Sequence, residues 1–444
     1  MQQQKTVTDF LENDFSPSAL YLNFRSQPSA IDGLKNSHRK AIYTLKKKNI
    51  KDRQKVSQLG PLVAAETDYL HGDASIIGAI TTLGQDYAGT NNLPLLVADG
   101  NFGTRFSHDP SAPRYIYTYP QKYFNSIFRK EDDVNLITQI FEGSEIEPRF
   151  YVPTIPLLLV NGCTGIGVGF ASKILCRDPL NMIKAIQNTL DKKRLSLNLF
   201  TPSFKGFTGD VVSVGNNKWQ IRGKASLSGH KLTITEIPIN YSLTDYISIL
   251  KKLKDKGLII KITDLSEDDK FHFELILSAE EASKDIEVIM NDLKLITPFT
   301  ESLTCLDTNN AIREFKSPKE IFDYYFQIKI EYLNKRIESE IKRLTLESQS
   351  LEEIYKFILD VIDNKINLKL KKAEVEKQII SRGYKSIDKL LNMPLVSITQ
   401  EKAEEAKNKY ESKIQELEAM KKETAESLWK KDLAELEKQL KENK

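Results

Sequence analysis

The stretch with the most information about fold and function spans residues 91–119 and reads NNLPLLVADGNFGTRFSHDPSAPRYIYTY. The glycine-rich turn in its middle would let the backbone approach a ligand closely. Arg105 and Arg114 bring positive charge near Tyr115, Tyr117 and Tyr119. If the chain is extended through these three tyrosines, their phenols fall on one face of a strand.

This pattern suits a tyrosine that attacks phosphorus. A phenol is a poor nucleophile at its ordinary pKa near 10. A neighbouring guanidinium would stabilise the phenolate and also hold a phosphodiester. The alternative is an aromatic strand that packs into a core, because the chain contains 17 tyrosines and most tyrosines are structural.

A second motif, IDGLKNSHRKAIY at residues 31–43, predicts a helix that Ser37 caps and that opens on cations. Cations at a helix N-terminus oppose the helix dipole, whereas a bound anion there is favourable. The motif therefore indicates a phosphate site, and Lys47 and Lys48 would extend it. An ordinary amphipathic helix with solvated lysines remains the alternative.

Two further motifs could contact nucleic acid. In DYLHGDAS, residues 68–75, His71 lies in a turn, where it would face a phosphate or bind a backbone carbonyl. In PLLLVNGCTGIGVG, residues 156–169, a predicted strand runs into a glycine-rich loop with Ile166 between two glycines. Phe170 breaks the G-x-G-x-x-G pattern and no Walker lysine follows, so dinucleotide binding is disfavoured. Ile166 could wedge between base pairs, or it could belong to a plain tight turn.

The chain changes character twice along its length. Residues 146–315 contain β-branched runs that predict strands, namely IPLLLV, GDVVSV, KWQIRG and HKLTITEIPI, together with a helix at 244–256. From residue 319 onward the only Gly and Pro are Gly383 and Pro394, which predicts almost continuous helix. A heptad seam is formed there by Ile337, Ile341, Leu344, Ser348, Leu351, Tyr355, Ile358 and Ile362.

A second helix follows this seam, with Ala406, Tyr410, Ile414, Leu417 and Met420 on one face. Between the two helices lies the apolar segment KSIDKLLNMPLVSIT, residues 385–399. These features predict an antiparallel helical pair with a small tip that forms a dimer contact. A solvated hairpin packed on its own body is the alternative.

Composition restricts the partners and the compartment. The 444 residues contain 64 Lys and Arg against 61 Asp and Glu, a net charge of +3, so an anionic partner must be met by a local patch rather than by bulk charge. No apolar run approaches 18 residues, and the N-terminus does not read as a secretory signal. Three scattered cysteines suit a reducing compartment and give no zinc spacing. We therefore expect a cytoplasmic protein.

Taken together, the motifs resemble the breakage–reunion core of type IIA DNA topoisomerases. The matching blocks follow the order of that family and cover nearly the whole chain: DGLK…RK, HGD, NNLPLLVADGNFGTR, SAPRYIYT, IPLLLVNGCTGIGVG, TITEIPI and LLNMPLVSIT. The resemblance implies a multidomain α+β fold. Its expected parts are an N-terminal segment (1–18), a winged-helix DNA-gate domain with the nucleophile (19–145), a mixed α/β tower domain with an intercalating loop (146–318), and a long antiparallel coiled-coil arm with a helical dimerisation tip at the exit gate (319–444).

The resemblance also assigns residues. It implies Tyr115 as the nucleophile, Arg114 beside it at the scissile phosphate, and Arg39 and His71 as phosphate contacts. Three positions depart from the family pattern. Leu70 stands where the family frequently has His, Asp73 where its eukaryotic members have Glu, and Asn36 where it often has Pro. The residues expected to bind DNA are Lys35, Lys40, Lys47, Lys48, Arg105 and the wedge Ile166.

The resemblance further implies how the activity is divided. The motifs EGDSA, PLRGK and D-x-D-x-D-G do not occur in the sequence. This pattern is most similar to the T-even-like phage branch, in which a medium subunit carries the nucleophile. A separate large subunit with Toprim and ATPase modules would bind ATP and would hold most of the Mg²⁺ coordination. The chain would act as a homodimer, joined at a DNA gate and an exit gate, that passes one DNA duplex through another.

Two rival functions are considered. The basic helix, the wedge and the heptads also suit a DNA-bending architectural protein dimerised by a coiled coil. A phosphate-binding enzyme built on the loop of residues 162–169 is the second rival.

Overall fold

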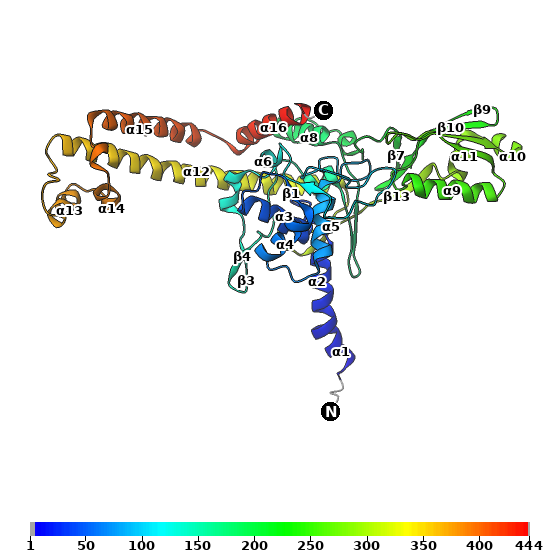
Figure 1. Cartoon of the computed structure of the whole chain (residues 1–444), viewed down its shortest axis with the longest axis horizontal. Coiled ribbons are helices and arrows are strands. Elements are labelled where there is room, and N and C mark those ends of the chain that lie inside the picture. Colours follow the sequence, from blue (N-terminus) through cyan, green and yellow to red (C-terminus); the bar gives the residue numbers. More distant parts are fainter. Residues whose placement is uncertain (1–4, 443–444) are drawn as a thin grey trace. The chain divides into compact units, whose positions relative to one another are not determined.

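The computed structural model describes residues 5–442, which form two compact units. Among these residues, the first unit combines residues 5–329 with residues 430–442, and the second is Ile330–Trp429. The second unit therefore begins and ends inside the segment 319–444 that was expected to form the arm. The last helix returns to the first unit, where Lys430 pairs with Asp191 at 2.7 Å and Gln187 bonds Glu437. Figure 1 shows α16 beside α8.

The first unit begins with a helical segment and a three-helix core. The opening segment comprises α1 (Val7–Phe10), a π-helical turn η1 (Leu11–Phe15) and α2 (Ser16–Ser26). The core helices α3 (Asn36–Lys47), α4 (Val56–Glu66) and α5 (Asp73–Gly84) pack through side chains such as Ile42, Leu59 and Ile80, which are all buried. Helix α3 begins one residue before Ser37, and its N-cap, Lys35, makes no side-chain cap bond. The predicted Ser37 cap is therefore wrong.

Short elements follow these helices. Strands β1 (Gln54–Lys55) and β2 (Tyr117–Thr118) form an antiparallel ribbon. Next come α6 (Phe124–Ile127), the 3-10 turn η2 (Lys130–Asn135) and the hairpin of β3 (Gln139–Phe141) with β4 (Ser144–Ile146). The ribbon fixes the chain two residues after Tyr115.

The predicted strand at residues 155–160 is instead the short helix α7 (Leu157–Asn161). Pro156 precedes it, Gly162 ends it at φ +63°, and its first four residues are buried, so their unbroken apolar run reflects burial rather than a strand. Strands β5 (Cys163–Ile166) and β6 (Ala171–Ile174) follow. They form a sheet of order β15-β14-β6-β5 with β14 (Ser302–Leu306) and β15 (Ile312–Glu314).

The strands predicted between residues 209 and 239 are confirmed. Helix α8 (Pro179–Leu190) and turn η3 (Leu197–Phe200) precede a sheet of order β13-β8-β7, built from β7 (Asp210–Gly215), β8 (Lys218–Arg222) and β13 (Ile296–Thr300). A second antiparallel sheet, here called the four-stranded sheet, has the order β11-β12-β10-β9. Its strands are β9 (Lys224–Ser228), β10 (Lys231–Glu236), β11 (Ile259–Asp264) and β12 (Phe273–Leu277).

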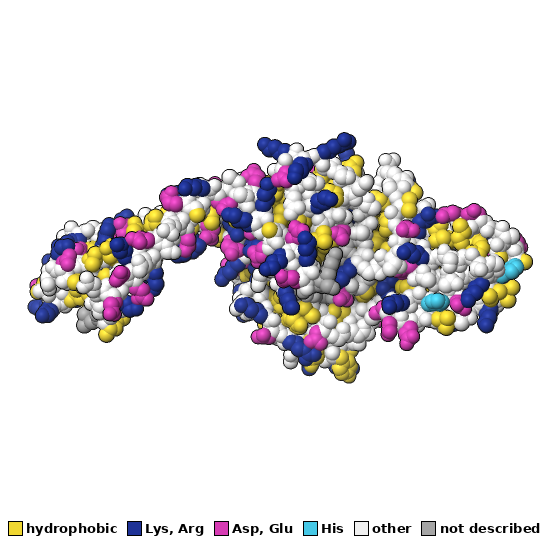
Figure 2. Space-filling model, turned by 90° about the horizontal axis from the view of Figure 1, so that it is seen from above, with side chains coloured by type: hydrophobic (Ala, Val, Ile, Leu, Met, Phe, Trp, Pro, Cys, Tyr) yellow, Lys and Arg dark blue, Asp and Glu magenta, His cyan; other side chains and the backbone are white. Residues whose placement is uncertain are grey.

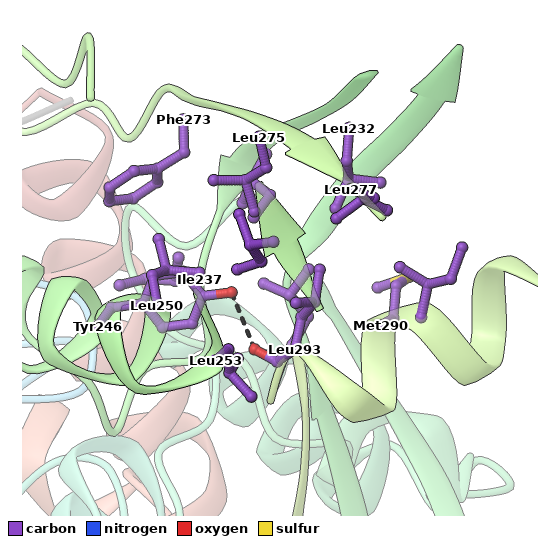
Figure 3. Packing of buried hydrophobic residues seen from close by; sticks show 14 of the residues in the cluster. Leu232, Ile237, Tyr246, Leu250, Leu253, Phe273, Leu275, Leu277, Met290 and Leu293 are labelled. Atoms are coloured by element: carbon purple, nitrogen blue, oxygen red, sulfur yellow. Dashed lines mark hydrogen bonds between the residues drawn. The ribbon is translucent and has the colours of Figure 1, made fainter. Parts of the chain in front are cut away.

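Helices cover the four-stranded sheet and enclose an apolar core. They are α9 (Leu243–Asp255), which confirms the predicted helix, α10 (Ala279–Ala282) and α11 (Ile286–Asp292). Figure 3 shows Leu250 and Phe273 in this core, where the Tyr246 hydroxyl donates to the Leu293 carbonyl at 3.0 Å. We call this sheet with its helices the sheet module.

The second unit is helical. Helix α12 (Pro318–Ile362) enters it from the first unit, and α13 (Lys372–Ser381), α14 (Ile387–Leu391) and turn η4 (Leu395–Ser397) form its tip. Helix α15 (Gln400–Lys421) then runs back along α12, with Lys413 3.9 Å from Glu347, before α16 (Ala425–Glu442) begins. The seam residues Leu344, Ser348 and Ile358 are buried. The helical pair is thus present as predicted. No helix within residues 5–442 has the length and apolarity needed to cross a membrane.

Candidate active site and DNA-facing residues

Tyr115 lies in a tight turn and is 66 % exposed. Its amide donates to the Ala112 carbonyl at 2.9 Å, and the Arg114 guanidinium lies 4.9 Å from the centre of its ring. The next residue, Ile116, is buried, and its carbonyl accepts the Val56 amide at 3.1 Å. The buried Ile116 thus anchors a turn on which the Tyr115 phenol is accessible and lies beside the Arg114 guanidinium.

The three tyrosines do not share one strand face, so that expectation is wrong. Only Tyr117 and Thr118 are in a strand, because the turn at Tyr115 precedes it. The Arg53 guanidinium covers the Tyr117 ring at 3.5 Å and pairs with Asp99, whose pKa this hydrogen bond lowers. Tyr117 is therefore held by neighbours that Tyr115 lacks.

Arg53 and Lys55 are cations beside Tyr117 that the sequence motifs missed. Lys55 lies 5.6 Å from the centre of the Tyr117 ring, because β1 pairs with β2 in a register that places these two residues opposite each other. Only a prediction of that strand pairing could have found them, since more than 60 residues separate the two strands in sequence.

Two of the expected phosphate-binding cations are buried in ion pairs. Arg39 is 1 % exposed and donates to Asp32 at 2.8 and 3.1 Å and to the Leu34 carbonyl. Lys40 donates to Glu147 at 2.8 Å and to the Thr67 carbonyl at 2.7 Å. Direct phosphate contact by Arg39 or Lys40 therefore does not fit this structure, because both charges are neutralised below the surface.

The other expected cations differ in exposure. Lys35 is half-buried at the start of α3 and lines a cavity of about 420 Å³ together with His38. Lys47 and Lys48 lie at the surface and pair with Glu66 at 3.3 and 2.6 Å. These three side chains remain available to an anion, although Lys47 and Lys48 would have to leave Glu66.

Arg105 does not face solvent, contrary to the expectation of DNA contact. It is buried, with its guanidinium 3.1 Å from Glu236, and it donates to the Ile237 carbonyl at 2.9 Å. The guanidinium also stacks over Phe271 at 4.9 Å. Burial lowers its pKa, and Glu236 opposes that effect. Its partners are more than 130 residues away in sequence, so the local motif could not reveal them.

His71 is half-buried in a small aromatic cluster. Its Nε2 lies 2.6 Å from the Tyr21 hydroxyl of α2, and its ring lies edge-on to Tyr69. Burial lowers the pKa of His71, and the positive charges of Arg25 and Lys40 lower it further. Within residues 5–442, no hydrogen bond, ion pair or ring contact joins Arg39 or His71 to Tyr115.

Ile166 protrudes as predicted and is 81 % exposed, although it ends strand β5 rather than sitting in a loop. The flanking glycines have a packing role: a Cβ at Gly165 would overlap the Ser26 carbonyl, and one at Gly167 would overlap the Asn23 side chain. Asn23 also exchanges two hydrogen bonds with Val168, at 2.8 and 3.1 Å. Helix α2 thus supports the hairpin while the Ile166 side chain stays free.

Two carboxylates of the acidic runs are buried in ion pairs. Asp132 pairs with Lys329 at 3.1 Å, and Glu147 pairs with Lys40. Within residues 5–442, no group of three or more His, Cys, Asp or Glu side chains is arranged to hold a metal ion.

The surface charge agrees with the balanced composition. On the face shown in Figure 2, Lys and Arg side chains alternate with Asp and Glu rather than forming one continuous basic surface.

Comparison with known proteins gives one consistent result. Residues 25–434 match the family model that describes the A subunits of DNA gyrase and topoisomerase IV. The chain is 31% identical over 98% of its length to the mitochondrial DNA topoisomerase 2 of Dictyostelium discoideum, and 32% identical over 97% to DNA topoisomerase 2-alpha of Gallus gallus. It covers 35% and 30% of these relatives, so it spans about a third of their length.

A solved structure matches as well. The DNA-binding, cleavage and re-ligation domain of Plasmodium falciparum topoisomerase II superposes with a TM-score of 0.89 at 29% identity. The match covers 98% of this chain and 64% of that chain.

Proposed function

The chain belongs to the DNA gyrase/topoisomerase IV family of type IIA topoisomerases, and from this premise we propose that it cleaves and rejoins DNA through Tyr115. The observation that carries the proposal is the exposed Tyr115 phenol on an anchored turn, with the Arg114 guanidinium 4.9 Å from its ring. This is the arrangement that an attack on a phosphodiester requires.

The chemistry is a reversible transesterification. The Tyr115 oxygen forms a bond to phosphorus, the phenolic proton is lost, and one bond from that phosphorus to a deoxyribose oxygen breaks. Arg114 stabilises the phenolate and the phosphate oxygens. The phosphotyrosine ester conserves the energy of the broken phosphodiester bond. The freed deoxyribose hydroxyl can therefore reverse the reaction and reseal the strand.

Other residues would bind and bend the DNA. Surface cations such as Lys35, Lys47 and Lys48 would contact phosphates, and His71 would approach the scissile phosphate with Tyr21. Ile166 would insert between base pairs, since its side chain is free on a supported hairpin. Arg39 would act indirectly, by holding Asp32 and the start of α3 in place.

The chain would work as a homodimer. Two copies would each cut one strand of a gate duplex at the winged-helix domain, and a second duplex would pass through the gap and leave at the tip of the second unit. The exposed apolar side chain of Val396 at that tip, 82 % exposed, supports a contact with a second copy.

We further propose that Mg²⁺ and ATP act from another polypeptide. Within residues 5–442 there is no group of three or more potential metal ligands, and the metal would be held mainly by a large subunit with Toprim and ATPase modules. This is the arrangement implied by the resemblance to the T-even-like phage branch. Adding such a partner should convert a chain with little cleavage activity of its own into an active enzyme.

Trapping of covalent adducts tests the proposal. The chain, the large subunit, Mg²⁺ and duplex DNA are mixed and quenched with denaturant, using wild type, Tyr115→Phe and Tyr117→Phe. We expect adducts from wild type and Tyr117→Phe but none from Tyr115→Phe. Noncovalent affinity should stay within about twofold in Tyr115→Phe, because cation–phosphate contacts supply most of it.

Tyr117→Phe is the matched control, since it removes the same hydroxyl two residues away. Equal loss of adduct in both variants would contradict the choice of nucleophile. DNA bending by the wild type without any adduct would instead favour the architectural protein.

A further inference from the structure

The loop between Gly100 and Ser111 contains a compact turn that presents two side chains to the sheet module. Gly103 has φ +98°, and a Cβ there would crowd the His108 carbonyl. The Thr104 amide donates to the Ser107 carbonyl at 2.7 Å, and the Thr104 hydroxyl accepts the Phe106 amide at 3.0 Å. This turn places Arg105 against Glu236 of strand β10 and Phe106 against Phe271.

The turn is fixed firmly on the sheet module. Besides the contacts of Arg105 with Glu236 and Phe271, the Arg105 carbonyl accepts the Leu243 amide at 3.1 Å. Phe106 packs on Phe271, with ring centres 5.6 Å apart, against the core of the module. The second oxygen of Glu236 is held by the Thr208 amide and hydroxyl at 3.0 and 3.1 Å. The carboxylate therefore has a fixed position of its own.

The other end of the loop leads directly to the nucleophile. The Ser111 amide donates to the Asn101 carbonyl at 2.9 Å, and the Asn101 side chain accepts the Gly103 amide at 2.8 Å. Ser111 is followed at once by Ala112, whose carbonyl accepts the Tyr115 amide. A continuous series of short bonds thus connects the Arg105 turn to the Tyr115 turn.

We propose that Arg105 is a positioning residue for Tyr115: its buried pair with Glu236 fixes the loop on the sheet module and thereby sets the place of the Tyr115 turn. A displacement of the sheet module, for example by bent DNA, would then move the nucleophile. The inference rests on the proposed role of Tyr115 in cleavage, and it assigns to Arg105 a function other than DNA contact.

Hydrogen exchange on the free chain tests the connection without any partner. The variants are Arg105→Gln and Glu236→Gln, and Arg222→Gln is the matched control, because Arg222 pairs with Glu287 in the same region but does not touch the loop. We expect exchange in residues 111–117 to rise about fivefold or more in the first two variants, since local opening becomes easier. Arg222→Gln should behave as wild type.

Single-turnover cleavage by the assembled enzyme tests the consequence. The maximal rate of adduct formation should fall about 10- to 100-fold in Arg105→Gln, because small displacements of a nucleophile cost that much. The DNA concentration at half-maximal rate should stay unchanged. Arg105→Lys, which keeps the charge beside Glu236, should restore much of the rate. If the Arg105–Glu236 pair were only structural, Arg105→Gln would lower thermal stability but would not lower the maximal rate selectively while leaving the DNA concentration at half-maximal rate unchanged.

The outcomes are distinguishable. Wild-type exchange at residues 111–117 together with a wild-type rate in folded Arg105→Gln would overturn the proposal. If Arg105→Gln does not fold, Glu236→Asp gives the same comparison with a smaller change. A wild-type enzyme that forms no adduct would refute the proposed function, whereas the exchange experiment would still decide whether Arg105 holds the turn.

Discussion

Replacing Asp32 with Asn should destabilise the first unit strongly, because Asp32 is the sole carboxylate bonded to the buried Arg39 guanidinium in the described part of the chain. Asp32 is fully buried and accepts from Arg39 Nε at 2.8 Å, from Arg39 Nη2 at 3.1 Å, and from the Leu34 and Tyr151 amides at 2.9 Å each. Asn retains the shape but removes the negative charge. A buried cation is then left uncompensated.

The expected cost follows from that geometry. Breaking a buried ion pair by removing one partner destabilises a protein by about 3–5 kcal/mol. With an m-value of about 3 kcal/mol/M, the urea midpoint should fall by about 1 M or more. The measurement is urea unfolding followed by circular dichroism and by the fluorescence of the two tryptophans, Trp219 and Trp429, and coincident curves would justify a two-state treatment.

Glu66→Gln is the matched control for this prediction. Glu66 pairs with Lys47 and Lys48 at the surface, where an ion pair contributes about 0–1 kcal/mol. A loss in Asp32→Asn no larger than in Glu66→Gln would refute the reasoning. It would mean that Arg39 does not depend on Asp32 and could be free to contact a phosphate after all.

Three more predictions concern single side chains. Ile166→Ala should reduce the DNA bend angle in a fluorescence-transfer assay while changing stability by less than about 0.5 kcal/mol, because the side chain is 81 % exposed; an unchanged bend would exclude the wedge role. Burial, helped by the charges of Lys35 and Arg39, lowers the pKa of His38 to about 3, whereas the unfolded value is near 6.5. Between these two pKa values the unfolded state binds more protons than the folded state, so the free energy of unfolding should fall as the pH drops from about 6.5 to about 3, by at most about 1.4 kcal/mol per pH unit. His38→Gln should flatten the dependence of the urea midpoint on pH. Identical profiles for wild type and variant would contradict this prediction. Val396→Asp should weaken self-association about tenfold or more in sedimentation experiments, and an unchanged equilibrium would remove the tip from the dimer interface.

Much of the local structure could be read from the sequence because it depends on residues close together in the chain. The heptad spacing from Ile337 to Ile362 predicted helix α12, since an apolar residue every three or four positions makes one helical face. The β-branched runs predicted β7, β8 and β10 for the same kind of reason. The run at 155–160 failed because a fully buried apolar segment has no period that separates a strand from a helix.

The roles of individual cations could not be read in this way. Arg105, Lys40 and Arg39 stand in basic motifs, and local charge alone suggests three surface contacts to phosphate. Each is buried against a carboxylate, and two of these partners, Glu236 and Glu147, lie more than 100 residues away. Tyr115 and Ile166, by contrast, are exposed as their motifs suggested.

The sequence by itself therefore determined the helices α3, α9, α12 and α15, the strands β7, β8 and β10, and the two exposed side chains of Tyr115 and Ile166. Only the tertiary structure decided which cations are neutralised inside the protein and that α16 returns to the first unit. The physical reason is that burial and ion pairing depend on which distant segments pack together, and the energy of burying a charge is acceptable only where a partner arrives from elsewhere in the fold.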